Sequence, residues 1–150
     1  MCFNFLYHRR YGITKPNNTI KADYIQLYSK LQSEFPEANL NLWDYKYKLA
    51  PFSEYVRFIE WDLTDLVEYI KDYHDCDDFA LALAGALNSV PKWSSLTFGL
   101  LILNEPPHLM CIFVDDEYKV WIVEPQSDKY YKVSELRDKI GMIAEAIIIG

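Results

Sequence analysis

A chain of 150 residues, 51% of them hydrophobic, is long enough for one domain with a core and too apolar to be disordered. The net charge of −7 and the scattered lysines and arginines disfavour nucleic acid or a membrane as the main partner. No apolar run has transmembrane length, and we expect no signal peptide. The three cysteines, Cys2, Cys76 and Cys111, are widely spaced and form no CxxC pair, which favours a reducing compartment over a disulfide scaffold or a zinc site. We therefore expect a cytoplasmic location, which for a viral protein would be the host cytoplasm.

The first half of the chain is predicted to be mainly helical. A helix with one apolar stripe is expected over residues 19–35 and is ended by the proline that follows it. Residues 43–48 alternate aromatic and charged side chains, which indicates a short extended segment. Two further helices are expected, one through residues 54–60 and one over residues 76–88.

The second half is predicted to be mainly β-structure, with a last helix capped by Ser134. The predicted strands are residues 96–103, 108–114, 118–124, 130–133 and 147–149. Helices followed by an antiparallel sheet indicate an α+β fold, with residues 1–150 forming a single domain and the helix that begins at Cys76 packed on the sheet.

Cys76 stands where that helix begins. Asp75 is a good N-cap, and Asp78 can complete a capping box. The free amide groups and the helix dipole favour a thiolate in the first turn, as in cysteine hydrolases of the papain and transglutaminase type. From Phe79 to Leu87 the helix is apolar on every face, which predicts burial. The alternative is a capped core helix that contains a small apolar cysteine.

Three carboxylates, Asp75, Asp77 and Asp78, crowd the same helix end. Negative charge there repels a thiolate, so either some of these side chains point away or a cation lies among them. Clustered carboxylate oxygens are ligands of the kind that calcium takes, which makes the three residues a candidate calcium site. The alternative is a set of helix caps along a solvated acidic edge.

A hairpin is expected to bring His108 and Glu124 together. If residues 115–117 form a three-residue loop, Val114 faces Tyr118 and His108 faces Glu124, about 5 Å apart at Cβ, on the side that the Cys76 helix covers. This arrangement predicts a catalytic triad, with Cys76 as nucleophile, His108 as general base and Glu124 as the residue that orients the base. His74 is the reserve base. Cys111 points the other way and is interpreted as a core sulfur.

These residues carry a family resemblance. Asp75 to Ala80 (DCDDFA), His108 and Val123 to Gln126 (VEPQ) together resemble the papain-like cysteine peptidase family related to the C-terminal domain of Marasmius agglutinin, and especially its stand-alone bacterial and phage members described as lectin-related. The resemblance implies a papain-like fold, a Cys-His-Glu triad and, from the fungal lectin, calcium-dependent proteolysis. The β-trefoil that binds sugar in that lectin is absent here. Papain has an oxyanion-hole glutamine shortly before its nucleophile, but residues 67–74 here contain none, so the backbone N–H of Cys76 is one candidate donor.

The leading functional expectation is therefore a thiol hydrolase that cleaves peptide or isopeptide bonds in a protein or peptide substrate. One alternative is a catalytically silent papain-like fold that acts as an interaction protein, for example a viral protein that binds a host factor. Another is a Cys-His amidase or acyltransferase. Oligomeric state and substrate specificity do not follow from the sequence.

Overall fold

The structure is a computed structural model that describes residues 12–150; Cys2 and His8 lie outside the described residues. The strands are β1 (Ile20–Lys21), β2 (Asn39–Leu42), β3 (Lys48–Leu49), β4 (Phe98–Glu105), β5 (His108–Val114), β6 (Val120–Glu124), β7 (Lys129–Lys132) and β8 (Ile143–Ile149). The helices are α2 (Tyr24–Glu34), α3 (Phe52–Trp61), α4 (Cys76–Asn88) and α5 (Val133–Ile140), with a 3-10 turn η1 (Thr64–Leu66).

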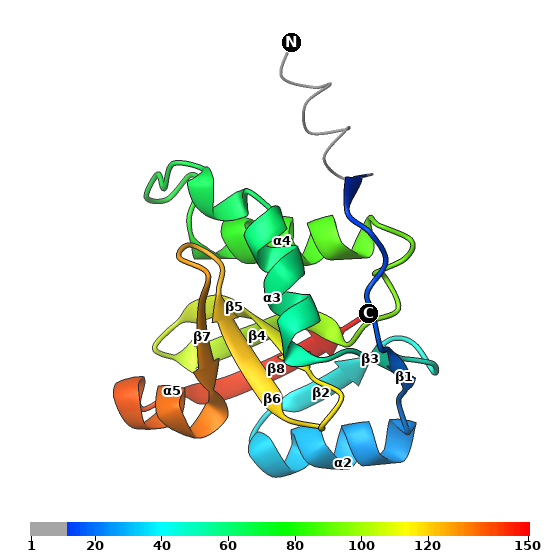
Figure 1. Ribbon diagram of the computed structural model, residues 1–150. Coiled ribbons are helices and arrows are strands. Elements are labelled where there is room, and N and C mark those ends of the chain that lie inside the picture. Colours follow the sequence, from blue (N-terminus) through cyan, green and yellow to red (C-terminus); the bar gives the residue numbers. More distant parts are fainter. Residues whose placement is uncertain (1–11) are drawn as a thin grey trace.

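A six-stranded sheet forms the centre of the molecule, in the order β2-β8-β4-β5-β6-β7 (Figure 1). All neighbours are antiparallel except β2 and β8, which are parallel. A separate ribbon pairs β1 with β3. The fold is thus mixed α and β, as expected. The prediction that the sheet is antiparallel throughout was wrong, because β2 and β8 run parallel. The strand that breaks the pattern is β2, which the sequence did not reveal because its four residues alternate asparagine and leucine without a β-branched side chain.

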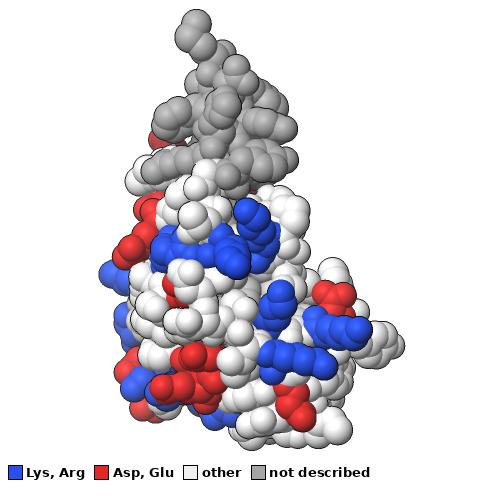
Figure 2. Space-filling view, turned by 45° about the vertical axis from the view of Figure 1, so that its right-hand side comes forward, with Lys and Arg blue, Asp and Glu red and all other residues white. Residues whose placement is uncertain are grey.

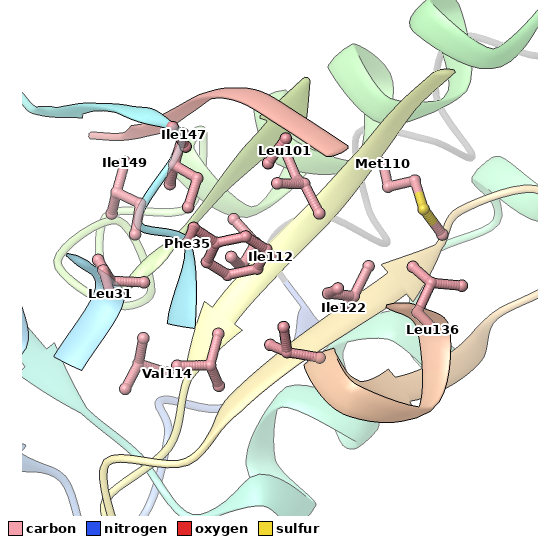
Figure 3. Close-up of a cluster of buried hydrophobic side chains, with 14 of the residues drawn as sticks. Leu31, Phe35, Leu101, Met110, Ile112, Val114, Ile122, Leu136, Ile147 and Ile149 are labelled. Carbon is pink, nitrogen blue, oxygen red and sulfur yellow. The ribbon is translucent and has the colours of Figure 1, made fainter. Parts of the chain in front are cut away.

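Helices cover both faces of the sheet. In Figure 1, α3 and α4 lie above the sheet, and α2 and α5 lie below it. The side chains on the lower face form a buried cluster that includes Leu31 and Phe35 near the end of α2 and Leu136 of α5, packed against Ile112 and Ile122 of the central strands (Figure 3). Strands β4, β5, β6 and β7 therefore contribute alternate residues to two separate cores.

The upper core packs α3 and α4 against the other side of the same strands. Tyr55 of α3 is fully buried and stacks on Phe113 of β5 with ring centroids 4.2 Å apart. The Tyr55 hydroxyl donates to the carbonyl oxygen of Val114 at 3.0 Å, which satisfies the one polar atom that this large side chain buries. The thiol of Cys111 points to the carbonyl oxygen of Ala80 in α4, at 3.4 Å. Cys111 is a core sulfur, as predicted, and α4 packs on the sheet.

Helix α4 is only partly buried. Leu83 and Leu87 face the sheet and are buried, whereas Leu81 is 53% exposed and Gly85 is also exposed. The prediction of a helix buried on every face was wrong because an apolar residue on a helix can remain in solvent when no element covers that side. Within residues 12–150, no helix is long and apolar enough to cross a membrane.

The β5–β6 hairpin has a longer connection than expected. Val114 pairs with Val120, not with Tyr118, so the loop holds five residues instead of three. The Asp115 carboxylate explains this, since its Oδ1 accepts from the backbone N–H groups of Glu117 (3.0 Å) and Lys119 (2.9 Å). Its Oδ2 accepts from the indole N–H of Trp121 at 2.8 Å. A buried aspartate thus organises the loop from within.

Candidate functional site

His108 and Glu124 form a hydrogen-bonded pair at the edge of the lower core. His108 begins β5 and Glu124 ends β6, and Nε2 of the imidazole lies 2.7 Å from Oε2 of the carboxylate. The side chains are 24% and 20% exposed, so the pair is partly shielded from water but reachable by a ligand. The predicted contact between these residues is present, although the register that led to it was wrong.

The pair lines a cavity of about 400 Å³ between the sheet and α5. Met110 and Leu136 give the cavity apolar walls, and Tyr131 and Lys139 add polar groups. The Lys139 ammonium lies 5.0 Å from the centroid of the Tyr131 ring and 3.5 Å from the Tyr131 hydroxyl oxygen. The cavity therefore combines an acceptor carboxylate, a cationic donor and an aromatic ring with a hydroxyl group.

This cavity lies on the opposite face of the sheet from α4. His108 belongs to the same alternate set of β5 residues as Met110 and Ile112, which are part of the lower core. The residues that face α4 are Cys111 and Phe113. The expectation that His108 points to the side covered by the Cys76 helix was therefore wrong, because the sequence alone could not show which face each helix takes.

Cys76 is half-buried at the start of α4. Within residues 12–150 it makes no hydrogen bond to His108 or to Glu124, while those two residues bond each other. The second described cysteine, Cys111, is fully buried, and burial, followed by the charge of Glu124, raises the pKa of its thiol. The structure thus joins two of the three residues predicted for one site, and a shared site with Cys76 stays a prediction.

The three aspartates at the start of α4 have different surroundings. Asp78 acts as a cap, because its Oδ2 accepts from the backbone N–H of Asp75 at 3.2 Å. Asp75 and Asp77 interact with each other, and this hydrogen bond raises the pKa of Asp75 and lowers the pKa of Asp77. Ligand atoms of Asp75, Cys76 and Asp77 lie within 4.8 Å of one another.

That donor set fits calcium poorly. Calcium takes about six to eight oxygen ligands. Asp75 and Asp77 offer carboxylate oxygens, Cys76 offers a sulfur, and Asp78 is engaged in capping the helix. Calcium binding by Asp75, Asp77 and Asp78 stays a prediction, and no step of the account below depends on it.

His74, the reserve base, belongs to the helix cap. Its Nδ1 lies 3.9 Å from Oδ2 of Asp78, and its ring packs on Phe79 with centroids 4.8 Å apart. Its Nε2 is buried without a hydrogen-bond partner in the described chain. These contacts place His74 beside the start of α4 and not in the cavity of His108.

Sequence reasoning missed Tyr131 and Lys139. Both lie in the C-terminal segment β7–α5, which had no role in the expected site. The sequence did hold one indication that Lys139 belongs beside the core. Leu136 and Lys139 are three residues apart and so lie at neighbouring positions on one face of a helix. Which strand that face covers depends on the packing of α5 and could not be read from the spacing.

Comparison with known proteins found similar chains by structure alone. No protein-family model and no curated protein matches this chain. A solved structure titled "PSL1a-E64 complex" superposes with a TM-score of 0.67 at 18% identity and covers 85% of this chain and 51% of its own. Polyporus squamosus lectin, bound to the human-type influenza-binding epitope Neu5Acα2-6Galβ1-4GlcNAc, superposes with a TM-score of 0.68 at 16% identity, with 85% and 49% covered.

The likeness to these two structures shows a shared fold. This chain spans about half the length of the lectin chains that it matches. The neighbours are lectins, which corrects the assignment to a papain-like cysteine peptidase family and the functions expected from it, namely a thiol hydrolase or a Cys-His amidase or acyltransferase. The lectin-related part of the expected resemblance is supported.

Proposed function

We propose that this chain is a non-catalytic binding module and that the cavity beside His108 and Glu124 binds a carbohydrate. The observation that carries the proposal is the cavity itself. It has about 400 Å³ of space, apolar walls and a few convergent polar groups, which is the usual composition of a small-molecule site. Of the functions considered from the sequence, a carbohydrate-binding module is closest to the alternative of a non-catalytic interaction protein.

The polar groups of the cavity suit a sugar. A sugar hydroxyl donates and accepts hydrogen bonds at once, so its site needs both kinds of partner. The Glu124 carboxylate accepts, the Lys139 ammonium donates, and the Tyr131 hydroxyl can do either. Because His108 holds Glu124 at 2.7 Å, the carboxylate is positioned before any ligand arrives, which reduces the entropy lost on binding.

The structural neighbours support carbohydrate as the first ligand class to test. One of them is a lectin solved with a sialylated trisaccharide. Since the likeness covers about half of that lectin, its sugar specificity does not transfer with the fold. The choice of cavity accordingly rests on the residues of this chain.

A glycan microarray probed with the labelled full chain tests the proposal. We expect concentration-dependent, saturable binding to a subset of glycans. Glu124→Gln should weaken that binding about tenfold, since it removes one charge-assisted acceptor. Glu68→Gln, the same substitution on an exposed residue outside the cavity, should bind like the wild type. Failure to bind any glycan, or equal binding by wild type and Glu124→Gln, would overturn the proposal.

A further inference from the structure

Three lysines that are far apart in the sequence line one cavity near the β1–β3 ribbon. Lys15, Lys48 and Lys92 surround about 490 Å³, together with the polar side chains of Asn17, Asn18 and Thr19. No acidic residue lines this space. Figure 2, in which the side of the molecule that carries β1 and β3 comes forward, shows lysine and arginine side chains gathered on this face. The basic residues are scattered along the chain but not in space.

The positive region continues into a neighbouring cavity of about 330 Å³. Lys21 and Lys46 line this second cavity, which shares Lys48 and Thr19 with the first and also lacks an acidic residue. None of the five lysines has an ion pair within residues 12–150, whereas four other basic side chains of the described chain each pair with a glutamate. In a chain of net charge −7, an uncompensated group of five cations needs an explanation.

The register of the ribbon brings two of these charges together. Lys21 of β1 lies directly opposite Lys48 of β3, so the two side chains share one face. Like charges in opposed positions destabilise a strand pair unless an anion lies between or beside them. Two backbone hydrogen bonds fix the position of Lys48. Its N–H donates to the carbonyl oxygen of Ser95 at 2.8 Å, and its carbonyl oxygen accepts from the backbone N–H of Thr97 at 3.2 Å.

The loop on the other side of the cavity is also fixed. Asn17 donates from its backbone N–H to Oε2 of Glu54 at 3.0 Å and from Nδ2 to Oε1 at 3.2 Å. Arg57 pairs with the same Glu54 carboxylate at 2.5 Å and donates to the Lys15 carbonyl at 3.1 Å. Burial opposes ionisation of Glu54, but the hydrogen bonds from Arg57 and Asn17 outweigh it and lower the pKa of Glu54. This acid is therefore already neutralised by Arg57 and does not compensate the lysines.

We infer that the Lys15–Lys48–Lys92 cavity binds a phosphate or sulfate ester group of a small ligand. Ammonium groups and neutral amide or hydroxyl donors are the partners that a tetrahedral oxyanion takes, and charge-assisted hydrogen bonds are the strong ones. A small ligand fits better than a long polyanion, because the chain as a whole carries 22 acidic residues against 15 basic ones, and its net negative charge repels a polymer that extends beyond the cavity. This site shares no residue with the proposed carbohydrate cavity, so the two proposals can be tested independently.

The test is a titration of the ¹⁵N-labelled full chain followed by NMR. The probes are glucose 6-phosphate, glucose 6-sulfate, inorganic phosphate, inorganic sulfate and glucose as the neutral control. We expect saturable shifts of the Asn18, Thr19 and Lys48 amides with the charged probes and none with glucose, with affinity that falls as salt is added. Whichever ester binds more tightly identifies the source of the group.

Two variants separate a site from general attraction of anions. Lys48→Gln should weaken binding about tenfold, since it removes one charge-assisted donor, whereas Lys71→Gln, on an exposed residue outside both cavities, should bind like the wild type. A short oligothymidylate, titrated in the same way, serves as the polyanion control. Equal weakening by both variants, linear shifts without saturation, or tighter binding of the oligothymidylate than of either sugar ester would overturn the inference.

Discussion

His108 and Glu124 are diagonal neighbours, not directly opposed residues. The ladder pairs Cys111 with Val123, and one more step in the same register places Glu124 opposite Met110. Diagonal positions on one face are about 7–8 Å apart at Cα, which long side chains can span. The imidazole and the carboxylate close that gap to 2.7 Å, so the two side chains lean toward each other along the wall of the cavity.

The His108–Glu124 pair should stabilise the fold modestly. In a double-mutant cycle with His108→Ala and Glu124→Gln, we expect a coupling free energy of about 1 kcal/mol, because the pair is partly shielded but not buried. Urea denaturation of the four proteins at neutral pH measures it. A coupling indistinguishable from zero would mean that solvent screens the pair and that it does not hold Glu124 in place.

Asp128 should make the fold less stable as the pH rises. Burial, helped by the charges of Asp65, Asp62 and Glu60, raises the pKa of Asp128 to about 7. The unfolded value is about 3.9, so between these pH values the folded state keeps a proton that the unfolded state has lost. The resulting penalty is absent below about pH 4 and complete above about pH 7. Asp128→Asn should therefore stabilise the protein on the order of 1 kcal/mol more at about pH 8 than at about pH 4, after discounting for solvent.

Asp72→Asn is the matched control for that experiment. Asp128 and Asp72 both have left-handed backbones, with φ of 53° and 65°, and asparagine is well tolerated there. Any gain from backbone preference should appear in both variants at every pH. A pH dependence of equal size in both variants would contradict the assignment of the effect to the surroundings of Asp128.

Gly99 should be intolerant of any side chain. A Cβ atom at this position of β4 would lie 1.9 Å from the carbonyl oxygen of Ile148 in β8, so the two strands would have to separate. Gly99→Ala should cost about 2 kcal/mol or more of unfolding free energy. Gly85→Ala, in an open position of α4, should instead stabilise the protein by about 0.5–1 kcal/mol. Thermal or urea denaturation of both variants tests the prediction, and equal effects would contradict the β4–β8 pairing.

The two described thiols should react differently. Cys76 is half-buried and Cys111 is fully buried with a raised pKa, so iodoacetamide should label Cys76 in the folded protein and Cys111 only after unfolding. In a binding module, Cys76 should react no faster than an accessible cysteine in a peptide. Peptide mapping after timed labelling measures this. Much faster labelling of Cys76 by iodoacetamide or by an epoxide probe would contradict the non-catalytic account.

Local signals in the sequence predicted the elements with strong boundaries. The Asp75–Asp78 box correctly predicted a helix that begins at Cys76, and the predicted strand 108–114 matches β5. A cap or a proline acts through its nearest neighbours, so it can be read from a few residues. The start of the helix predicted at residues 19–35 was placed too early in the chain. The N-cap is Asp23, whose Oδ1 accepts from the backbone N–H of Gln26, and residues 20–21 instead form strand β1.

Long-range arrangement was the part that the sequence did not reveal. The strand predicted at residues 147–149 is only the end of β8, an inner strand between β2 and β4. The side of the sheet that α4 takes, the lysine cavity and the wall formed by Tyr131 and Lys139 all depend on contacts between distant segments. Each of these contacts follows from the packing of whole elements, which no local spacing specifies.

The most direct test of the central claim is to locate a bound carbohydrate on the protein. The glycan with the strongest array signal is titrated into the ¹⁵N-labelled full chain, and the amide shifts are mapped. The account predicts saturable shifts centred on His108, Glu124, Tyr131 and Lys139, with at least about tenfold weaker binding by Glu124→Gln. Saturable shifts confined to another part of the molecule, or no saturable shift at all, would contradict it.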